Sequence, residues 1–139
     1  MIVVDSSVAV KWYVAEPDSG RARTLIGRPL LAPDLIRAEV ANALWKKVRR
    51  GEATAAQARG ALPHLARSVI LLPSEPFSEM ALDLSLDLGH SVYDYFFLEM
   101  ARTLDFPLLT SDEKLWTRTR GSSFADGVIL LRDWDQEHD

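Results

Sequence analysis

The amino-acid sequence predicts an α/β fold, in which helices cover both faces of a mostly parallel, five-stranded sheet. Two observations predict it. Five short apolar runs alternate along the chain with longer stretches of helical periodicity, which is typical of successive β–α units. The first run, Ile2-Val3-Val4, is β-branched with no polar alternation, as in a strand that is buried on both faces. Such a strand needs a neighbour on each edge, so we place it at the centre of the sheet.

Each element has a local reason in the sequence. The apolar runs that we expect as strands are residues 2–4, 30–32, 69–72, 107–110 and 128–131. The stretches that we expect as helices are residues 8–14, 20–26, 35–50, 54–67, 74–88, 91–102 and 112–118. Asp34 is placed to cap the helix over 35–50, and Gly51 to end it. Thr54 is placed to cap the next, alanine-rich helix, which Pro63 is expected to interrupt. The four tryptophan side chains are expected to pack beneath helices.

Length and composition define the class of protein. The chain of 139 residues, with 47% hydrophobic and 26% charged residues, suits one globular domain over 1–139, with an acidic tail at about 133–139 that we expect to fray. It has no cysteine, which excludes disulfides and thiolate metal sites and fits a reducing compartment. We expect no signal peptide and no membrane span, because no basic region precedes an apolar stretch and no apolar run is long enough. The expected location is the cytoplasm.

Four acidic residues are expected to meet at the carboxyl ends of the strands, where open α/β sheets bind their ligands. Asp5 follows the first strand and Asp112 follows the fourth. Glu39 lies one to two turns inside the long helix after the second strand, among apolar neighbours. Asp94 lies in the first turn of a later helix, among aromatic residues.

Three of these acids also have a purely structural interpretation. Asp5 and Asp112 can each cap the helix that follows, and Asp94 can complete a capping box with Ser91. Glu39 is harder to explain in this way, because an acid on the core-facing side of a helix has to be paired or bound to something. The coincidence of all four at one edge of the sheet favours a functional site.

Four neighbouring carboxylates would need compensation for their charge. Each close pair repels by roughly 1–4 kcal/mol at surface-like dielectric, so protons or cations must occupy the site. Oxygen ligands without His or Cys favour Mg²⁺ or Mn²⁺, and one or two such ions can activate a water for displacement at a phosphodiester. Ser6, Thr110 and Ser111 lie beside the acids in the sequence and are expected to orient ligands or metal-bound water.

The sequence resembles the PIN-domain family, and its short format resembles the VapC-type toxins of prokaryotic toxin–antitoxin pairs. The motifs that carry the resemblance are MIVVDSS at the start, Glu39 within a long helix, YDYFFLEMA around Asp94 and LLTSDEKL around Asp112. They cover nearly the whole chain, and their order and spacing make them specific. The resemblance implies a five-stranded parallel sheet, for which we expect the strand order 3-2-1-4-5. It also implies an Mg²⁺- or Mn²⁺-dependent endoribonuclease whose acidic quartet is Asp5, Glu39, Asp94 and Asp112.

The resemblance implies partners as well. They are an RNA substrate, a second copy of the chain in a homodimer, and a cognate antitoxin whose segment wraps the toxin and blocks the site, with DNA contacted only through the antitoxin. Ser6 and Thr110 match polar positions that often accompany the quartet. One departure is Tyr95, where such toxins often have a small residue after the third acid. Its ring either stacks on a base or belongs to the core.

Charge is distributed unevenly along the chain. Residues 1–69 hold 11 Lys and Arg against 6 Asp and Glu, whereas residues 70–139 hold 5 against 14. This suggests a positive flank beside a negative pocket, or else only the solvation of helix faces. Lys11, Arg37 and Lys46 are candidate contacts to RNA phosphates, with exposed solubilising charge as the alternative.

Other interpretations have weaker support. His64, His90 and His138 share no segment and no i, i+4 pairing, so we expect neither a zinc site nor a histidine general base. A signalling receiver domain would need an acceptor Asp after the third strand, where this chain has Pro73-Ser74-Glu75. The remaining alternative is a catalytically silent PIN module that binds RNA or a partner protein.

Overall fold

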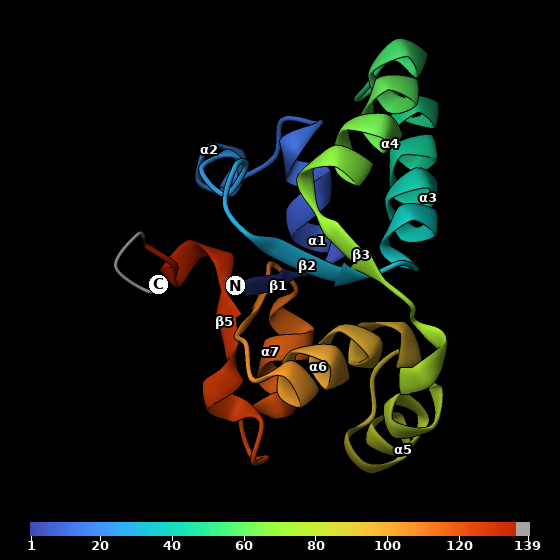
Figure 1. Cartoon of the computed structure of the whole chain (residues 1–139). Helices are drawn as coiled ribbons and strands as arrows, with labels where there is room; N and C mark the ends of the chain where they lie inside the picture. Colours follow the sequence, from blue (N-terminus) through green and yellow to red (C-terminus); the bar gives the residue numbers. More distant parts are fainter. Residues whose placement is uncertain (136–139) are drawn as a thin grey trace.

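The computed structural model of the protein describes residues 1–135 and has the predicted α/β architecture (Figure 1). The five strands are β1 (Ile2–Val4), β2 (Leu30–Pro33), β3 (Ile70–Leu72), β4 (Leu108–Thr110) and β5 (Val128–Leu130). All neighbouring strands are parallel, and their order is β3-β2-β1-β4-β5, as predicted. The apolar run at the start of the chain is therefore the central strand, and all its side chains are buried.

Helices cover both faces of this sheet. The helices are α1 (Ser6–Ala9), α2 (Ser19–Arg23), α3 (Ile36–Arg49), α4 (Ala55–Ser68), α5 (Ser78–Leu88), α6 (Val92–Leu104) and α7 (Glu113–Thr119). The 3₁₀ turns are η1 (Val10–Trp12), η2 (Glu75–Phe77), η3 (Ala125–Gly127) and η4 (Leu131–Asp133). Figure 1 shows α1 to α4 on one face and α5 to α7 on the other. Right-handed crossovers require this division, because the chain moves outward from β1 to β3 and then returns past β1 to β4 and β5.

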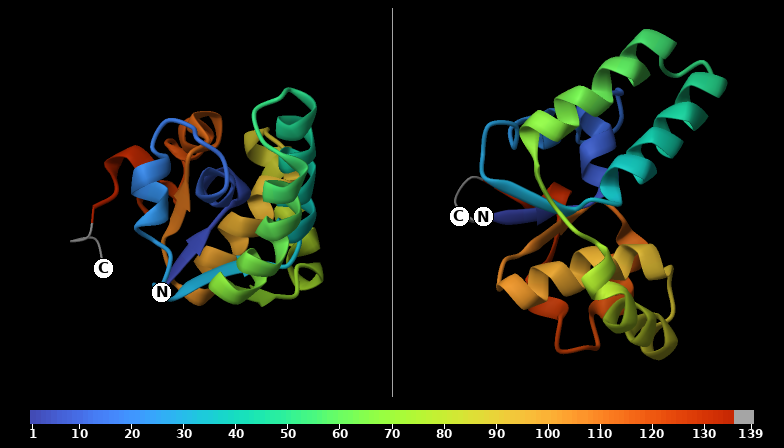
Figure 2. Two further views of the ribbon diagram at one scale, coloured as in Figure 1. Left: turned by 90° about the horizontal axis from the view of Figure 1, so that it is seen from above. Right: turned by 45° about the vertical axis from the view of Figure 1, so that its right-hand side comes forward.

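The helices α3 and α4 form an antiparallel pair that projects away from the sheet (Figure 2). Pro63 was expected to interrupt α4, but the helix runs unbroken through it. Pro63 has no N–H group, so the carbonyl group of Arg59, one turn earlier, loses its helical partner. Both residues are exposed, so water can replace the missing donor. Trp45 of α3 is 55% exposed, whereas Trp12 and Trp134 are buried. The prediction that all four tryptophans pack beneath helices was therefore wrong for Trp45.

One further local prediction was wrong, and one applies only in part to the described residues. Asp34 does not cap α3, because its carboxylate accepts hydrogen bonds from the backbone N and the hydroxyl of Ser74, at 3.1 and 2.6 Å. It therefore ties the start of α3 to the turn after β3. The predicted frayed tail begins with ordered residues: Asp133 ends η4, and Trp134 is buried and accepts a hydrogen bond from Arg21 through its carbonyl group. The rest of the tail lies outside the described residues.

No helix within residues 1–135 combines the length and the apolar character that crossing a lipid bilayer requires.

Candidate active site

Asp5 lies at the carboxyl end of the central strand and is only 1% exposed. Its Oδ1 accepts hydrogen bonds from the Ser7 hydroxyl at 2.5 Å and from the backbone N of Val8 at 3.2 Å, so Asp5 caps α1. Its Oδ2 accepts a hydrogen bond from the Thr110 hydroxyl at the end of β4. The capping and functional interpretations are therefore compatible, because the cap fixes the carboxylate at the edge of the sheet.

The two carboxylate oxygens of Asp112 also have different partners. Its Oδ1 accepts hydrogen bonds from the backbone N of Lys114 at 2.9 Å and of Leu115 at 3.2 Å, so it caps α7. Its Oδ2 lies 3.4 Å from Nε2 of His90. One oxygen thus anchors the helix, and the other is available to the site.

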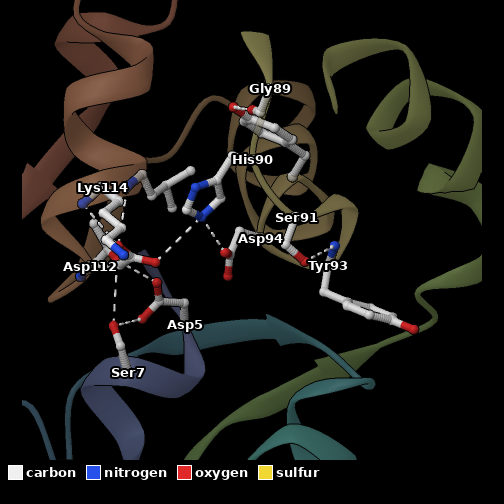
Figure 3. A network of polar contacts seen from close by, with 12 residues as sticks. Asp5, Ser7, Gly89, His90, Ser91, Tyr93, Asp94, Asp112 and Lys114 are labelled. Carbon is white, nitrogen blue, oxygen red and sulfur yellow. Dashed lines mark hydrogen bonds and ion pairs between the residues drawn. The ribbon is translucent and has the colours of Figure 1, made fainter. Parts of the chain in front are cut away.

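Asp94 points toward the same place from the first turn of α6. The capping box with Ser91, which was the structural alternative for Asp94, does not form, and the Oδ2 of Asp94 lies 2.6 Å from Nε2 of His90. Figure 3 shows Asp5, Asp94 and Asp112 facing one another around His90, while Tyr93 points away. Three elements that are far apart in the sequence therefore bring their carboxylates to one edge of the sheet.

Glu39 joins this cluster from α3. Its pKa is raised to about 7, first by burial and then by the negative charges of Asp94 and Asp5, against the opposing effect of a hydrogen bond from Ser6. Its Oε1 is buried and has no hydrogen-bond partner within residues 1–135. A buried carboxylate oxygen without a donor is costly, and a cation is one way to satisfy it.

The carboxylates perturb one another. The pKa of Asp5 is raised to about 7: burial is the largest cause, the hydrogen bonds from Ser7 and Thr110 oppose it, and the charge of Asp94 adds to it. Burial also raises the pKa of Asp94, with His90 opposing the shift and Asp112 adding to it. The donor set is rich in hard oxygens, it is crowded, and it has an unsatisfied buried oxygen. These properties fit a divalent cation.

The supporting hydroxyl groups differ in part from the prediction. Thr110 binds Asp5 and also accepts a hydrogen bond from the backbone N of Asp112 at 3.0 Å, so it links two of the acids. Ser111 contributes its backbone N–H, which donates to the Ser7 hydroxyl at 2.8 Å. Ser7 was not predicted, although it is the second serine after the first acid. Its single hydroxyl joins Asp5 to the loop after β4.

A cleft of about 360 Å³ opens over this cluster, with Asp5, Asp94 and Asp112 among its lining residues. Of the three predicted RNA contacts, only Lys11 lines it, and its Nζ lies 3.9 Å from Glu16. Arg37 and Lys46 are exposed residues of α3 outside the cleft. Lys47 lines it instead, and its Nζ lies 2.9 Å from Glu52.

Known proteins resemble this chain over most of its length. A model of the PIN domain matches residues 2–121. The chain belongs to the PIN-domain family. Ribonuclease VapC3 of Pyrobaculum aerophilum is 34% identical over 119 residues, which are 82% of this chain and 91% of VapC3. Exonuclease VapC9 of the same organism is 31% identical over 92 residues, 66% of this chain and 68% of VapC9.

Ribonuclease VapC1 of Mycobacterium tuberculosis is 37% identical over 86 residues, 60% of this chain and 63% of VapC1. The crystal structure of PAE2754 from P. aerophilum superimposes with a TM-score of 0.71 at 22% identity, covering 94% of this chain and 89% of that one. At that identity the likeness supports the PIN fold alone.

His90 is a further residue of this PIN domain that sequence reasoning missed. It forms with Asp94 and Asp112 a group whose ligand atoms lie within 4.8 Å of one another, so a histidine lies among acids that were expected to act without one. The signal was present in the sequence, because His90 and Asp94 are four residues apart, but only pairs of histidines were considered. The backbone of His90 has a φ of 94°, a conformation that few non-glycine residues adopt.

Tyr95 supports this loop. Its hydroxyl donates a hydrogen bond to the carbonyl group of Gly89 at 2.7 Å, and its ring meets that of His90 edge-on at a centroid distance of 6.1 Å. Tyr95 is fully buried, so its ring belongs to the core and does not offer a stacking surface to a base. The large residue after the third acid therefore packs against the loop that carries the histidine.

Proposed function

We propose that this protein is a divalent-metal-dependent endoribonuclease and the toxin of a VapBC-like, type II toxin–antitoxin pair. The observation that carries the proposal is the convergence of Asp5, Glu39, Asp94 and Asp112, with one buried oxygen of Glu39 left without a donor. Relatives that are named ribonucleases support the nuclease activity, and their VapC names support the toxin role.

In this proposal the four acids would hold one or two Mg²⁺ or Mn²⁺ ions. The bound cation would supply Lewis-acid activation of a water and would neutralise negative charge at the phosphate. The chain's own hydroxyl groups prepare the ligands: Thr110 and Ser7 fix the orientation of Asp5, and Ser6 orients Glu39. Lys11, at the wall of the cleft, favours the approach of the RNA backbone.

Two apolar surfaces support the proposed protein partners. Leu82 and Leu86 are 51% and 75% exposed and lie four residues apart on α5, which suits an isologous contact between two copies of the chain. A groove of about 290 Å³ between α3 and α4, with Trp45 at its edge, suits an apolar segment of an antitoxin. Sedimentation of the wild type against a Leu82→Glu/Leu86→Glu variant tests the dimer. Co-purification with the product of a neighbouring small reading frame tests the antitoxin.

The nuclease proposal is tested with a linear and a circular single-stranded RNA of the same sequence, with Mn²⁺, with Mg²⁺ and with EDTA. Cleavage of both RNAs that EDTA abolishes supports the proposal. Because one relative is named an exonuclease, degradation of the linear RNA alone would replace the endonuclease assignment with an exonuclease. Binding of RNA without cleavage of either form would favour the catalytically silent module.

A further inference from the structure

Two cations of α7 differ from the other cations in the acidic half of the chain. Residues 70–139 hold only five Lys and Arg. Three of them are engaged by carboxylates or by backbone carbonyl groups: Arg102, Arg120 and Arg132. Lys114 and Arg118 form no ion pair within the described part of the chain. Their positive charges are therefore available to a ligand.

Both cations line a second cleft, beside the carboxylate cluster. They lie four residues apart on α7, which places them on one face of the helix. The cleft has a volume of about 800 Å³, and its lining residues are Leu88, His90, Glu113, Lys114, Thr117 and Arg118. His90 also contacts Asp94 and Asp112, so this residue forms the border between the cleft and the cluster.

Lys114 and Arg118 both lie next to parts of the carboxylate cluster. The N–H of Lys114 donates to Asp112, and Figure 3 shows the two residues side by side. The guanidinium of Arg118 lies against Gly89, since a Cβ built there would meet its Nη1 at 3.6 Å. Arg118 therefore rests on the loop that carries His90.

We propose that this cleft binds a nucleotide of single-stranded RNA next to the scissile phosphate, with Lys114 and Arg118 contacting its phosphate groups and Thr117 available for a hydrogen bond. The inference rests on the proposed nuclease function. The volume lies within the usual range for small organic ligands, so one nucleotide unit at a time suits the cleft better than a duplex. Unpaired Lys and Arg are the usual contacts to nucleic-acid phosphates.

The lining of the cleft favours RNA over a protein partner. Leu88 is its one aliphatic lining residue, and the rest are polar or charged. The groove between α3 and α4 has the opposite character, since apolar side chains such as Leu44, Trp45 and Leu62 dominate its lining. An apolar peptide segment would therefore find its contacts on α3 and α4, and the cleft beside α7 is left for a charged, polar ligand.

The test compares a Lys114→Gln/Arg118→Gln variant with an Arg23→Gln/Arg59→Gln control. The control also removes two exposed positive charges, but from α2 and α4, outside both clefts. With Mn²⁺ and a single-stranded RNA, we expect the first variant to raise KM by about tenfold with little change in kcat. The slope of log(kcat/KM) against log(salt) should fall by about 0.7 per lost contact. The control should match the wild type, and an equal effect of both variants would overturn the proposal.

A separate binding experiment distinguishes failure of this proposal from failure of the proposed nuclease function. Both double variants are placed in an Asp5→Asn background, and the anisotropy of a labelled single-stranded RNA is measured with Mn²⁺. Weaker RNA binding by the Lys114/Arg118 variant alone supports the subsite, even if the wild type cleaves no RNA. If the Lys114/Arg118 variant binds RNA as tightly as the control does, the proposed subsite is overturned, and this face is left to a protein partner. If duplex RNA competes for the protein as well as single-stranded RNA does, the preference for single strands is overturned. The rise in Tm on adding Mn²⁺ to the double variant without the Asp5 change reports whether the carboxylate cluster is intact.

Discussion

The two halves of the carboxylate cluster compensate their negative charge in different ways. Asp5 and Glu39 come from the β1 and α3 side, are strongly shifted by burial, and form no ion pair with a cation of the described chain. Asp94 and Asp112 come from the α6 and α7 side and share the imidazole of His90. The carboxylates of one half are thus buried without a cationic partner, whereas those of the other half contact a neighbouring side chain. Burial also raises the pKa of Asp94, but effects of pH should be largest at Asp5 and Glu39, whose pKa values are raised to about 7.

The largest expected effect comes from replacing an acid of the histidine-bound half. Asp94→Asn keeps the shape and can keep a hydrogen bond to His90, but it removes the charge that would hold a cation. Loss of groups that only support a ligand costs about 10–100-fold, so loss of a proposed ligand should lower RNA cleavage by more than about 100-fold. Initial rates with Mn²⁺ measure this, and an unchanged circular dichroism spectrum shows that the fold persists. Wild-type activity would remove Asp94 from the mechanism.

The half of the cluster that contains Asp5 and Glu39 should make the free energy of unfolding depend on pH when no metal is bound. The native pKa of Asp5 is about 7, against an ordinary 3.8, so the folded state binds more protons than the unfolded chain between these values. The free energy of unfolding should therefore fall as the pH rises from about 4 to 7, and Glu39 acts in the same direction.

Asp5→Asn isolates this effect. One pKa unit corresponds to about 1.4 kcal/mol, so the shift from 3.8 to about 7 should make the variant more stable than the wild type by up to about 4 kcal/mol at pH 8, with a much smaller difference at pH 4.5. Urea unfolding in EDTA at the two pH values measures the difference. A constant difference between the proteins would show that the Asp5 carboxyl is not unusually basic in the folded state.

Divalent cations should reverse this loss of stability. A ligand present at 100 times its Kd stabilises the folded state by about 2.7 kcal/mol, so millimolar Mn²⁺ should raise Tm. The rise should be larger at pH 8 than at pH 5.5, because protons compete for Asp5 and Glu39 at the lower pH. Glu39→Gln should reduce the rise. A Tm that does not respond to Mn²⁺ at either pH would argue against a preformed cation site.

Replacing His90 tests whether its imidazole is a nitrogen ligand of the cation, in addition to Asp94 and Asp112. Imidazole suits Mn²⁺ better than Mg²⁺, which prefers oxygen ligands. We expect His90→Ala to weaken Mn²⁺ binding by about tenfold and Mg²⁺ binding by less, as measured by calorimetry. Equal losses for both ions would assign His90 to the orientation of Asp94 alone. His64→Ala is a matched control, since its partners are Tyr13 and Ser68, away from the acids.

Sequence reasoning predicted the features that depend on strand ends, and it failed where the geometry depends on how helices pack or on loop conformation. The β-branched run at residues 2–4 and the order of the acids were enough to predict the central strand and the edge where the acids meet. Lys46 was predicted as an RNA contact, but Lys47 lines the cleft and Lys46 does not. Helix phase would not have corrected this, because Lys46 lies only about 20° from Glu39 around the helix axis and Lys47 about 80°.

The positions of Asp34 and His90 could not be predicted in this way. The bond from Ser74 to Asp34 joins residues that are 40 positions apart, and only the pairing of β2 with β3 brings them together. His90 reaches the acids through a left-handed backbone conformation that the sequence around it does not specify. Long-range pairing and unusual loop conformations are therefore the two features that required the structure.

The smallest expected effect concerns the support beneath His90. Tyr95→Phe keeps the buried ring but removes the hydrogen bond to the carbonyl group of Gly89, which should cost about 1 kcal/mol of stability. If that bond holds His90 against Asp94 and Asp112, the variant should also lose part of the Mn²⁺ preference that His90→Ala removes. Urea unfolding and calorimetry on the same protein separate the two effects. A loss of stability with unchanged preference between the ions would mean that the strained loop keeps its conformation without the tyrosine hydroxyl, and that the contact of His90 with the two acids holds it in place.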